Sequence, residues 1–438
     1  MGEGGRASSS PPSALSRRPT IVFVAPQPPY PLTSGMTRRL FQLLEAYAAY
    51  GRVKLVFFYE GQAQLDAANG LVGLCESLHP VSVGTTHART ALARLNRWHR
   101  HLRLAWARRP AAMTREFSPE LASVVSELAA SADLVHVTAI HMVVQIEELL
   151  SRRGRQGQFV LDLPDVETAR HAKVLRFTPL RLWREIVLGS YDWLKLWAYQ
   201  RRVLPWFDRV LVCSERERQR LGGGNIVVVP NAIAVPPDVP RSEADDRTLL
   251  FLGNLSYPPN VDGAEFFVRS ILPKIRAEIP DVKLRIVGRT PTLRVRALHD
   301  GRTVHVEGDV GSVSDYYRKA TLAVVPLRFG GGTRIKILEA WAFGIPIVST
   351  SLGCEGLEAT DGEHLMVADT PSRFARACVE LLGDAAARRR LAERGRDLVV
   401  QKYRWETVRS QVVALTGSLV KVDSPTVEQR APRMVAVT

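Results

Sequence analysis

The sequence predicts an α/β protein of two consecutive domains, each a doubly wound parallel sheet covered by helices on both faces. Three observations carry this prediction. Short runs rich in Val, Ile and Leu alternate with helical stretches, and these runs are apolar at nearly every position, as in strands buried on both faces. The alternation stops at a proline cluster and then restarts. A chain of 438 residues also exceeds what one hydrophobic core usually supports.

Six runs in the first half predict strands. They cover residues 21–26, 53–59, 133–139, 158–163, 209–214 and 225–230. A proline-rich loop follows the first run and leads to residues 36–50, whose apolar positions recur at helical spacing. The predicted linker is PNAIAVPPDVP at 230–240, because proline interrupts both helices and strands.

The second half repeats the pattern. Strands are predicted at 248–253, 282–288, 303–308, 322–327 and 345–350, and helices at 261–279, 313–320, 333–343 and 371–382. Doubly wound sheets bind ligands at the carboxyl ends of their strands, so we expect a ligand in the cleft between the domains. The expected division is a disordered tail at 1–18, domains at 19–235 and 236–402, a helix at 403–420 that crosses back to the N-terminal domain, and a disordered tail at 421–438.

Composition narrows the class of function. No run approaches the roughly 18 uncharged apolar residues that a membrane span needs, and the N-terminus lacks a signal-peptide core, so we expect a cytoplasmic protein. The four cysteines have no metal-binding spacing, and we expect them to be buried and reduced. The net charge of +15 favours an anionic partner, which could be nucleic acid, anionic lipid or a phosphorylated substrate. Nucleic acid is the weakest of these, because no groove-reading motif is present.

The most informative segment is RFGGGTRIKILEAWAFGIP, at 328–346. Glycines let the backbone approach a ligand, and the N–H groups of a helix entrance face an anion. If the helix begins at Thr333, Arg334 and Lys336 lie near its first turn and would stabilise a diphosphate. Glu339 lies one turn further on, where it could accept hydrogen bonds from a ribose. A solvated or salt-bridged helical carboxylate is an equally open interpretation of Glu339.

Several loops at the expected carboxyl ends of the second sheet also carry glycine, and their convergence would suit a nucleotide. The alternative is a Rossmann-like domain with glycine turns and no nucleotide. The residues expected to bind the donor are Gly253, Asn254, Gly288, Arg289, Val310, Gly330, Gly331, Gly332, Thr333 and Glu339.

The second half resembles the donor domain of the retaining glycosyltransferases of family 4, through GGTRIKILEAWAFGIPIVST and LGCEGLEATDGEHLMVADTP. The first half is similar through YPLTSGMTRRL, DLPDVETAR, VCSERERQRL and VVPNAI, so the resemblance covers roughly residues 20–409. It implies the GT-B fold, with two Rossmann-like domains facing a central cleft. It also implies transfer of a sugar from a nucleoside diphosphate sugar to a hydroxyl of a glycan or lipid-linked acceptor. Glu339 takes the place of the family's ribose-binding glutamate.

The sequence departs from the family pattern in two places. The first glutamate of the family's E-x7-E motif usually contacts the donor sugar, and here that position is Gly331. A GGTR loop is a familiar variant, so we interpret Gly331 as a site of backbone N–H contacts to the sugar. The family often has an Arg and a Lys after the first donor-domain strand, whereas residues 254–267 contain no cation. Arg334 and Lys336 would supply the positive charge, with Arg289 assisting.

The mechanism that the resemblance implies depends on positioning and on stabilisation of the leaving diphosphate, and needs no enzymatic nucleophile. The donor half has no Asp-x-Asp motif, so we expect transfer without a metal or other cofactor. Arg334 and Lys336 are the expected catalytic residues, together with His141. The register of the family's histidine falls on Thr138, and either His136 or His141 could approach the acceptor or be structural. The residues expected to bind the acceptor are Ser34, Gly35, Arg38, Asp162 and Asp165, with loop capping as the alternative for the two carboxylates.

The segment between Ala88 and Arg115 contains eight arginines and no acidic residue. Its Leu and Trp residues fall on one side of a helix and its arginines on the other. This pattern is typical of a helix on an anionic membrane surface, and also of a core-packed helix with a solvated basic face. A second stretch rich in Trp and Arg, at 176–207, favours membrane binding and a peripheral location.

Two alternatives to a transferase stay open. One is a nucleotide-sugar epimerase or hydrolase of the same fold, and the other is a catalytically silent nucleotide-sugar-binding module.

Overall fold

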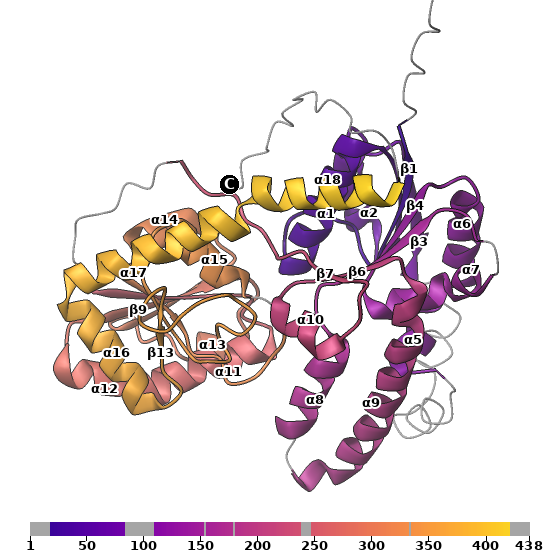
Figure 1. The fold of residues 1–438 in the computed structure, drawn as a ribbon. Helices are drawn as coiled ribbons and strands as arrows, with labels where there is room; N and C mark the ends of the chain where they lie inside the picture. The colour runs from indigo at the N-terminus through magenta and orange to yellow at the C-terminus, as the bar shows by residue number, and fades with distance from the viewer. Residues whose placement is uncertain are drawn as a thin grey trace, which may run out of the picture.

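The computed structural model describes residues 18–83, 109–152, 155–177, 180–237, 247–332 and 334–420. Within these ranges the chain forms two entirely parallel sheets flanked by helices (Figure 1). One sheet has seven strands and the other has six. The predicted α/β class with two doubly wound sheets is therefore confirmed.

The N-terminal sheet has the strand order β3-β2-β1-β4-β5-β6-β7. Its strands are β1 (Thr20–Ala25), β2 (Arg52–Tyr59), β3 (Ser77–Ser82), β4 (Leu134–Thr138), β5 (Gln158–Leu163), β6 (Arg209–Val212) and β7 (Ile226–Val228). The helices of this domain are α1 (Gly35–Tyr50), α2 (Gln62–Ala68), α5 (Ala111–Glu116), α6 (Pro119–Ala129), α7 (Glu147–Ser151), α8 (Glu167–Phe177), α9 (Trp183–Val203) and α10 (Glu215–Leu221). Strand β3 was not predicted, because its sequence SLHPVS contains Pro80; proline is tolerated there because β3 is an edge strand.

The C-terminal sheet has the order β10-β9-β8-β11-β12-β13. Its strands are β8 (Thr248–Leu252), β9 (Lys283–Gly288), β10 (Val304–Gly308), β11 (Leu322–Val325), β12 (Ile347–Ser349) and β13 (Met366–Val367). Its helices are α11 (Pro258–Phe266), α12 (Leu272–Glu278), α13 (Leu293–Arg296), α14 (Ser314–Lys319), α15 (Ile335–Ala342), α16 (Pro371–Gly383) and α17 (Ala385–Leu398). A π-helical turn, Phe267–Ile271, interrupts the single helix predicted at 261–279. Pro273 follows this turn and lacks the N–H that would continue an α-helical ladder.

Alternate residues of the central strands enter separate cores, which explains their continuous hydrophobicity. In β1, Val22 and Val24 pack on one face of the sheet, and Ile21 and Phe23 pack on the other. Leu250 of β8 is likewise packed apart from its neighbours along the strand. Both faces of both sheets are therefore covered, as β-branched parallel strands require.

The chain passes between the domains at two adjacent places. The backbone N–H of Ile233 donates to the carbonyl of Tyr403 at 2.9 Å, and the N–H of Trp405 donates to the carbonyl of Ile233 at 2.9 Å. The final described helix, α18 (Trp405–Val420), lies over α1 in the N-terminal domain and is yellow in Figure 1. Its residues Trp405, Val408 and Val412 belong to the core beneath α1.

Strand order reverses between β1 and β4 in the first sheet and between β8 and β11 in the second. The loop after β1 leads into α1, and the loops after β8 and β11 lead into α11 and α15. Ligands of open α/β sheets bind at such reversals, at the carboxyl ends of the strands. The fold therefore indicates a ligand site near the N-termini of α1 and α15.

Helix α15 is held in place by a close approach to α17. Trp341 is fully buried and its indole N–H donates to the carbonyl of His364 at 2.9 Å. A Cβ added to Gly395 of α17 would overlap the Trp341 ring. Glycine at 395 thus allows the two helices to pack against each other.

We expect Gly395→Ala to lower the free energy of unfolding by about 1–3 kcal/mol, because the methyl group overpacks the Trp341 site. The matched control is Gly383→Ala, at the end of α16, where an added Cβ meets nothing within 4 Å. The control should be neutral or stabilising by up to about 1 kcal/mol, since alanine favours helix. Urea unfolding followed by tryptophan fluorescence measures both, and equal effects of the two variants would contradict this packing.

Candidate active site

The N-terminus of α1 lies directly against the C-terminal domain. Ser34 caps this helix, its Oγ accepting a hydrogen bond from the Thr37 N–H at 3.1 Å, while the Thr37 hydroxyl accepts one from the Ser34 N–H. A Cβ on Gly35 would lie 3.0 Å from Cδ1 of Ile335, the first residue of α15. Ser34 and Gly35 thus lie where the two helix entrances meet.

Arg39 of α1 fixes this helix to its own sheet. Its guanidinium donates to both carboxylate oxygens of Asp162, with the shortest contact at 2.6 Å, and to the carbonyl of Val229 and the side-chain oxygen of Asn231. Both members of the ion pair are buried. Burial alone would lower the pKa of Arg39, but Asp162 raises it above its usual value. Asp162, expected to face an acceptor, is instead fully buried and paired, because a buried arginine needs a carboxylate partner.

The loop before α15 contains the feature that points most directly to a ligand. Gly330 and Gly332 have φ of 117° and 75°, a region that side chains rarely adopt. Arg334 follows and is 7% exposed. One of its nitrogens donates to the Gly331 carbonyl, while Nε and Nη2 are buried and have no hydrogen-bond partner among the described residues. Burial lowers the pKa of Arg334.

Helix α15 begins at Ile335, two residues later than predicted. Thr333, the predicted first residue of this helix, lies outside the described residues.

Lys336 lies on the first turn of α15. Its Nζ donates to Oδ1 of Asn260 at 2.8 Å and lies 5.0 Å from the centre of the Phe251 ring. Desolvation, with a further contribution from Arg334, lowers the pKa of Lys336 to about 7. A Cβ at Gly253 would lie 2.9 Å from this Nζ, so glycine leaves room for the ammonium group. Arg334 and Lys336 are therefore two poorly solvated basic groups, and within the described part of the chain no carboxylate is hydrogen-bonded to either.

Glu339 connects the two domains. Arg38 of α1 forms an ion pair with its Oε1, and the Tyr317 hydroxyl donates to its Oε2 at 3.0 Å. Burial and the neighbouring Glu339 raise the pKa of Tyr317 well above its ordinary value. Each carboxylate oxygen can accept a second hydrogen bond, so Glu339 retains capacity for a ligand hydroxyl.

The other loops of the C-terminal sheet lie around this centre. A Cβ on Gly288 would overlap the carbonyl of Gly253, so these two strand ends are in close contact. Arg289 reaches the N-terminal domain, with Nη1 3.5 Å from the Thr33 carbonyl.

The remaining predicted donor-binding residues make local contacts. The side chain of Asn254 accepts hydrogen bonds from the N–H and hydroxyl of Ser256. Val310 is partly buried against the core that contains α15.

The two histidines differ. His136 is fully buried between the Tyr47 hydroxyl and the Thr138 hydroxyl, 3.0 and 3.1 Å away, and burial lowers its pKa to about 3. It is therefore a neutral core residue. His141 is partly exposed after β4 and donates from Nδ1 to Glu167 at 2.7 Å. Burial opposes the charged form of Glu167, but the hydrogen bond and charge of His141 outweigh it and lower the Glu167 pKa.

A narrow interdomain crevice of about 30 Å³ lies beside the glycine loop. It is lined by Asp165, Ala169, Arg170, Ser214, Arg216, Glu217, Arg220, Gly331, Gly332, Glu355 and Gly356.

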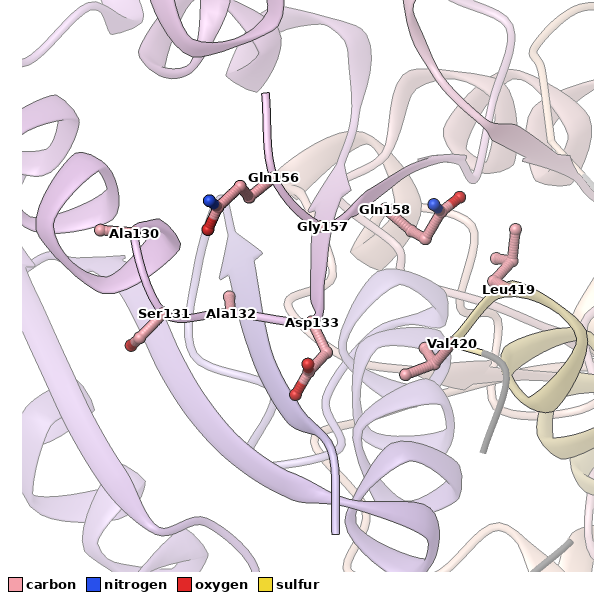
Figure 2. Close-up of a pocket in the computed structure, with 9 residues that line it drawn as sticks. All are labelled: Ala130, Ser131, Ala132, Asp133, Gln156, Gly157, Gln158, Leu419 and Val420. Carbon is pink, nitrogen blue, oxygen red and sulfur yellow. The ribbon is translucent and has the colours of Figure 1, made fainter. Parts of the chain in front are cut away.

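A larger pocket of about 550 Å³ lies elsewhere, between Asp133, Gln158 and the end of α18 at Val420 (Figure 2). It is at the amino ends of β4 and β5, opposite the edge where parallel sheets bind ligands. The cationic centre at α15 is therefore the better candidate site.

The structure does not describe most of the basic segment between Ala88 and Arg115 that was expected to lie on a membrane surface. No helix within the described ranges is long and apolar enough to cross a membrane. Those same ranges contain no cluster of three or more His, Cys, Asp or Glu residues suited to a metal ion. Sequence reasoning missed Arg39, Asn260 and Tyr317, because their roles depend on partners distant in the chain.

Residues 246–384 match the family model described as glycosyl transferases group 1. An uncharacterized 44.6 kDa protein in the cps region of Klebsiella pneumoniae is 24% identical over 235 residues, which cover 51% of this chain and 59% of the relative. A phosphatidyl-myo-inositol mannosyltransferase of Mycolicibacterium smegmatis is 25% identical over 250 residues, which cover 52% of this chain and 64% of the relative. The chain thus spans less than two thirds of the length of either curated relative.

Solved structures show the same architecture. Sucrose-phosphate synthase from Thermosynechococcus elongatus superposes with a TM-score of 0.64 at 18% identity, covering 92% of this chain and 100% of that one. Anabaena HepE, in complex with UDP and glucose, has a TM-score of 0.62 at 13% identity, with coverage of 92% and 100%. At these identities the likeness shows the fold alone. The C-terminal domain is thus similar to the glycosyl transferases group 1 over residues 246–384, and the two sheets of the chain form the GT-B fold.

Proposed function

We propose that the protein is a glycosyltransferase that moves a sugar, with retention of anomeric configuration, from a nucleoside diphosphate sugar to a hydroxyl of a glycan or lipid-linked acceptor. The observation that carries the proposal is Arg334. Two of its buried guanidinium nitrogens have no hydrogen-bond partner in the ranges that the structure describes, and such groups are costly in a folded protein unless an anion completes the site. The guanidinium follows a glycine-rich loop at the entrance to α15, where a diphosphate would also meet helix N–H groups.

In this proposal each group at the α15 entrance has a distinct task. Arg334 and Lys336 bind the diphosphate and stabilise the negative charge that grows on it as the glycosidic bond breaks. Glu339 accepts hydrogen bonds from the ribose. The acceptor hydroxyl approaches from the N-terminal domain, beside Ser34, Gly35 and Arg38 of α1, and passes its proton to the departing diphosphate. His141 orients the acceptor, supported by its hydrogen bond to Glu167.

The relatives support the substrate class. The mycobacterial relative is named a mannosyltransferase of phosphatidyl-myo-inositol, and the HepE structure contains UDP and glucose. A lipid-linked acceptor would place the enzyme at a membrane surface. The basic sequence between Ala88 and Arg115 supplies the positive charge for such a surface.

The proposal predicts that one of UDP, GDP and ADP binds measurably by calorimetry. Arg334→Gln should weaken that binding by about tenfold to a hundredfold, because a charge-assisted contact is lost. It should not lower the thermal stability of the unliganded protein, since it removes a buried charge to which no described carboxylate is hydrogen-bonded. The control is Arg328→Gln, in the same loop but exposed and paired with Asp262, which should bind like the wild type. The proposal fails if none of the three nucleotides binds, or if both variants bind like the wild type.

Lys336 should make nucleotide binding depend on pH. The free protein holds this lysine at a pKa of about 7, and a bound anionic diphosphate would raise it. Binding above pH 7 therefore takes up a proton, and the affinity should fall by up to about tenfold per pH unit as the pH rises from 7. Calorimetry in buffers of different ionisation enthalpy measures this proton uptake.

The comparison with Lys336→Gln separates the lysine from the titration of the nucleotide itself. The variant should lose the part of the proton uptake that belongs to the lysine. Identical proton uptake by the wild type and the variant would assign the pH dependence to another group.

A further inference from the structure

Gly331 is the position at which family resemblance leads one to expect a carboxylate, and the structure contains a carboxylate beside it. A Cβ built on Gly331 would lie 2.8 Å from Oδ1 and 2.8 Å from Oδ2 of Asp165. Real Cβ atoms do not approach oxygen so closely. The Asp165 carboxylate therefore occupies the space that a side chain on residue 331 would enter, and it would have to move to admit one.

The backbone gives no separate reason for glycine at 331. Gly330 and Gly332 on either side have positive φ, but Gly331 does not. A side chain would be conformationally acceptable there, and the atoms that it would meet are those of the Asp165 carboxylate. The structure thus places the Asp165 carboxylate beside the position where the family resemblance implies a glutamate.

Asp165 comes from the opposite domain, directly after β5 and before α8. Arg170, one turn into α8, lies 3.4 Å from Oδ2 of Asp165 and helps to orient it. Burial lowers the pKa of Arg334, and Tyr257 and the Asp165 carboxylate both act in the opposite direction. Asp165 and Gly331 both line the interdomain crevice. A carboxylate, a glycine loop and the cation of the diphosphate site therefore meet at one point.

We propose that Asp165 supplies, from the N-terminal domain, the carboxylate that binds hydroxyl groups of the donor sugar. This inference rests on the proposed function and assigns Asp165 to the donor rather than to the acceptor. Because the carboxylate and the glycine loop belong to different domains, recognition of the sugar requires the domains to be closed on each other. A nucleoside diphosphate without a sugar makes no use of this group.

The test compares two ligands that differ only in the sugar, UDP against UDP-glucose or GDP against GDP-mannose, with the base chosen from the nucleotide titration. Asp165→Asn should leave the affinity for the nucleoside diphosphate within about twofold, and weaken binding of the nucleotide sugar by about tenfold or more. Glu215→Gln is the control, since it removes an exposed carboxylate of the same domain that pairs with Arg218 on α10. It should change neither affinity.

A second experiment moves the carboxylate from residue 165 to residue 331. Gly331→Glu alone should weaken nucleotide-sugar binding, because the new carboxylate displaces and repels that of Asp165. Adding Asp165→Ala to Gly331→Glu removes this repulsion and leaves one carboxylate, now on the donor domain, and should restore affinity to within a few-fold of the wild type. Acceptance of a broader or different set of sugars by the double variant would support the same assignment.

The inference is overturned if Asp165→Asn weakens both ligands equally, which would mean that Asp165 only supports the loop, or if it weakens neither. It is also overturned if the double variant binds the nucleotide sugar no better than Gly331→Glu alone. Failure of the proposed function is a separate result, since the wild type would then bind no nucleoside diphosphate at all.

Discussion

The buried ion pair between Arg39 and Asp162 is the constraint on which the geometry of the cleft depends. It joins α1 to the carboxyl end of β5, and further hydrogen bonds from Arg39 reach the segment after β7. Loss of one partner would leave an uncompensated buried charge, which commonly costs about 3–5 kcal/mol. With α1 fixed in this way, the preceding residue Arg38 extends across the cleft to Glu339. Two adjacent arginines thus serve different ends: one holds the helix in its domain, and the other contacts the opposite domain.

The C-terminal side of the cleft is arranged in the opposite manner, because among the described residues no carboxylate is hydrogen-bonded to Arg334 or Lys336. Two buried nitrogens of Arg334 find no hydrogen-bond partner in the described part of the chain, and burial lowers the pKa of Lys336 to about 7. Such groups destabilise the unliganded protein, and the structure tolerates them because α15 is packed tightly through Trp341 against α17. A site already desolvated before the ligand arrives interacts more strongly with charge than an exposed one.

The sequence predicted the two sheets and the position of the cationic loop, because continuous β-branched runs and a glycine-rich helix entrance are local patterns. Features that depend on contacts between distant residues were beyond it. Asp162 and Asp165 looked equivalent in DLPDVETAR, yet one is buried against Arg39 and the other lies against Gly331 of the opposite domain. Strand β3 was missed because Pro80 breaks the expected pattern, and edge position cannot be read from a local run. Contacts between side chains 100 or more residues apart in the sequence become visible only in the folded structure.

The most direct measurement of the central claim is a crystal structure of the chain with a bound nucleoside diphosphate. The account predicts phosphate oxygens within hydrogen-bonding distance of Nε and Nη2 of Arg334, with Lys336 alongside and the ribose hydroxyls on Glu339. A nucleotide bound elsewhere, for example in the larger pocket beside Val420, with Arg334 still unpartnered, would contradict it.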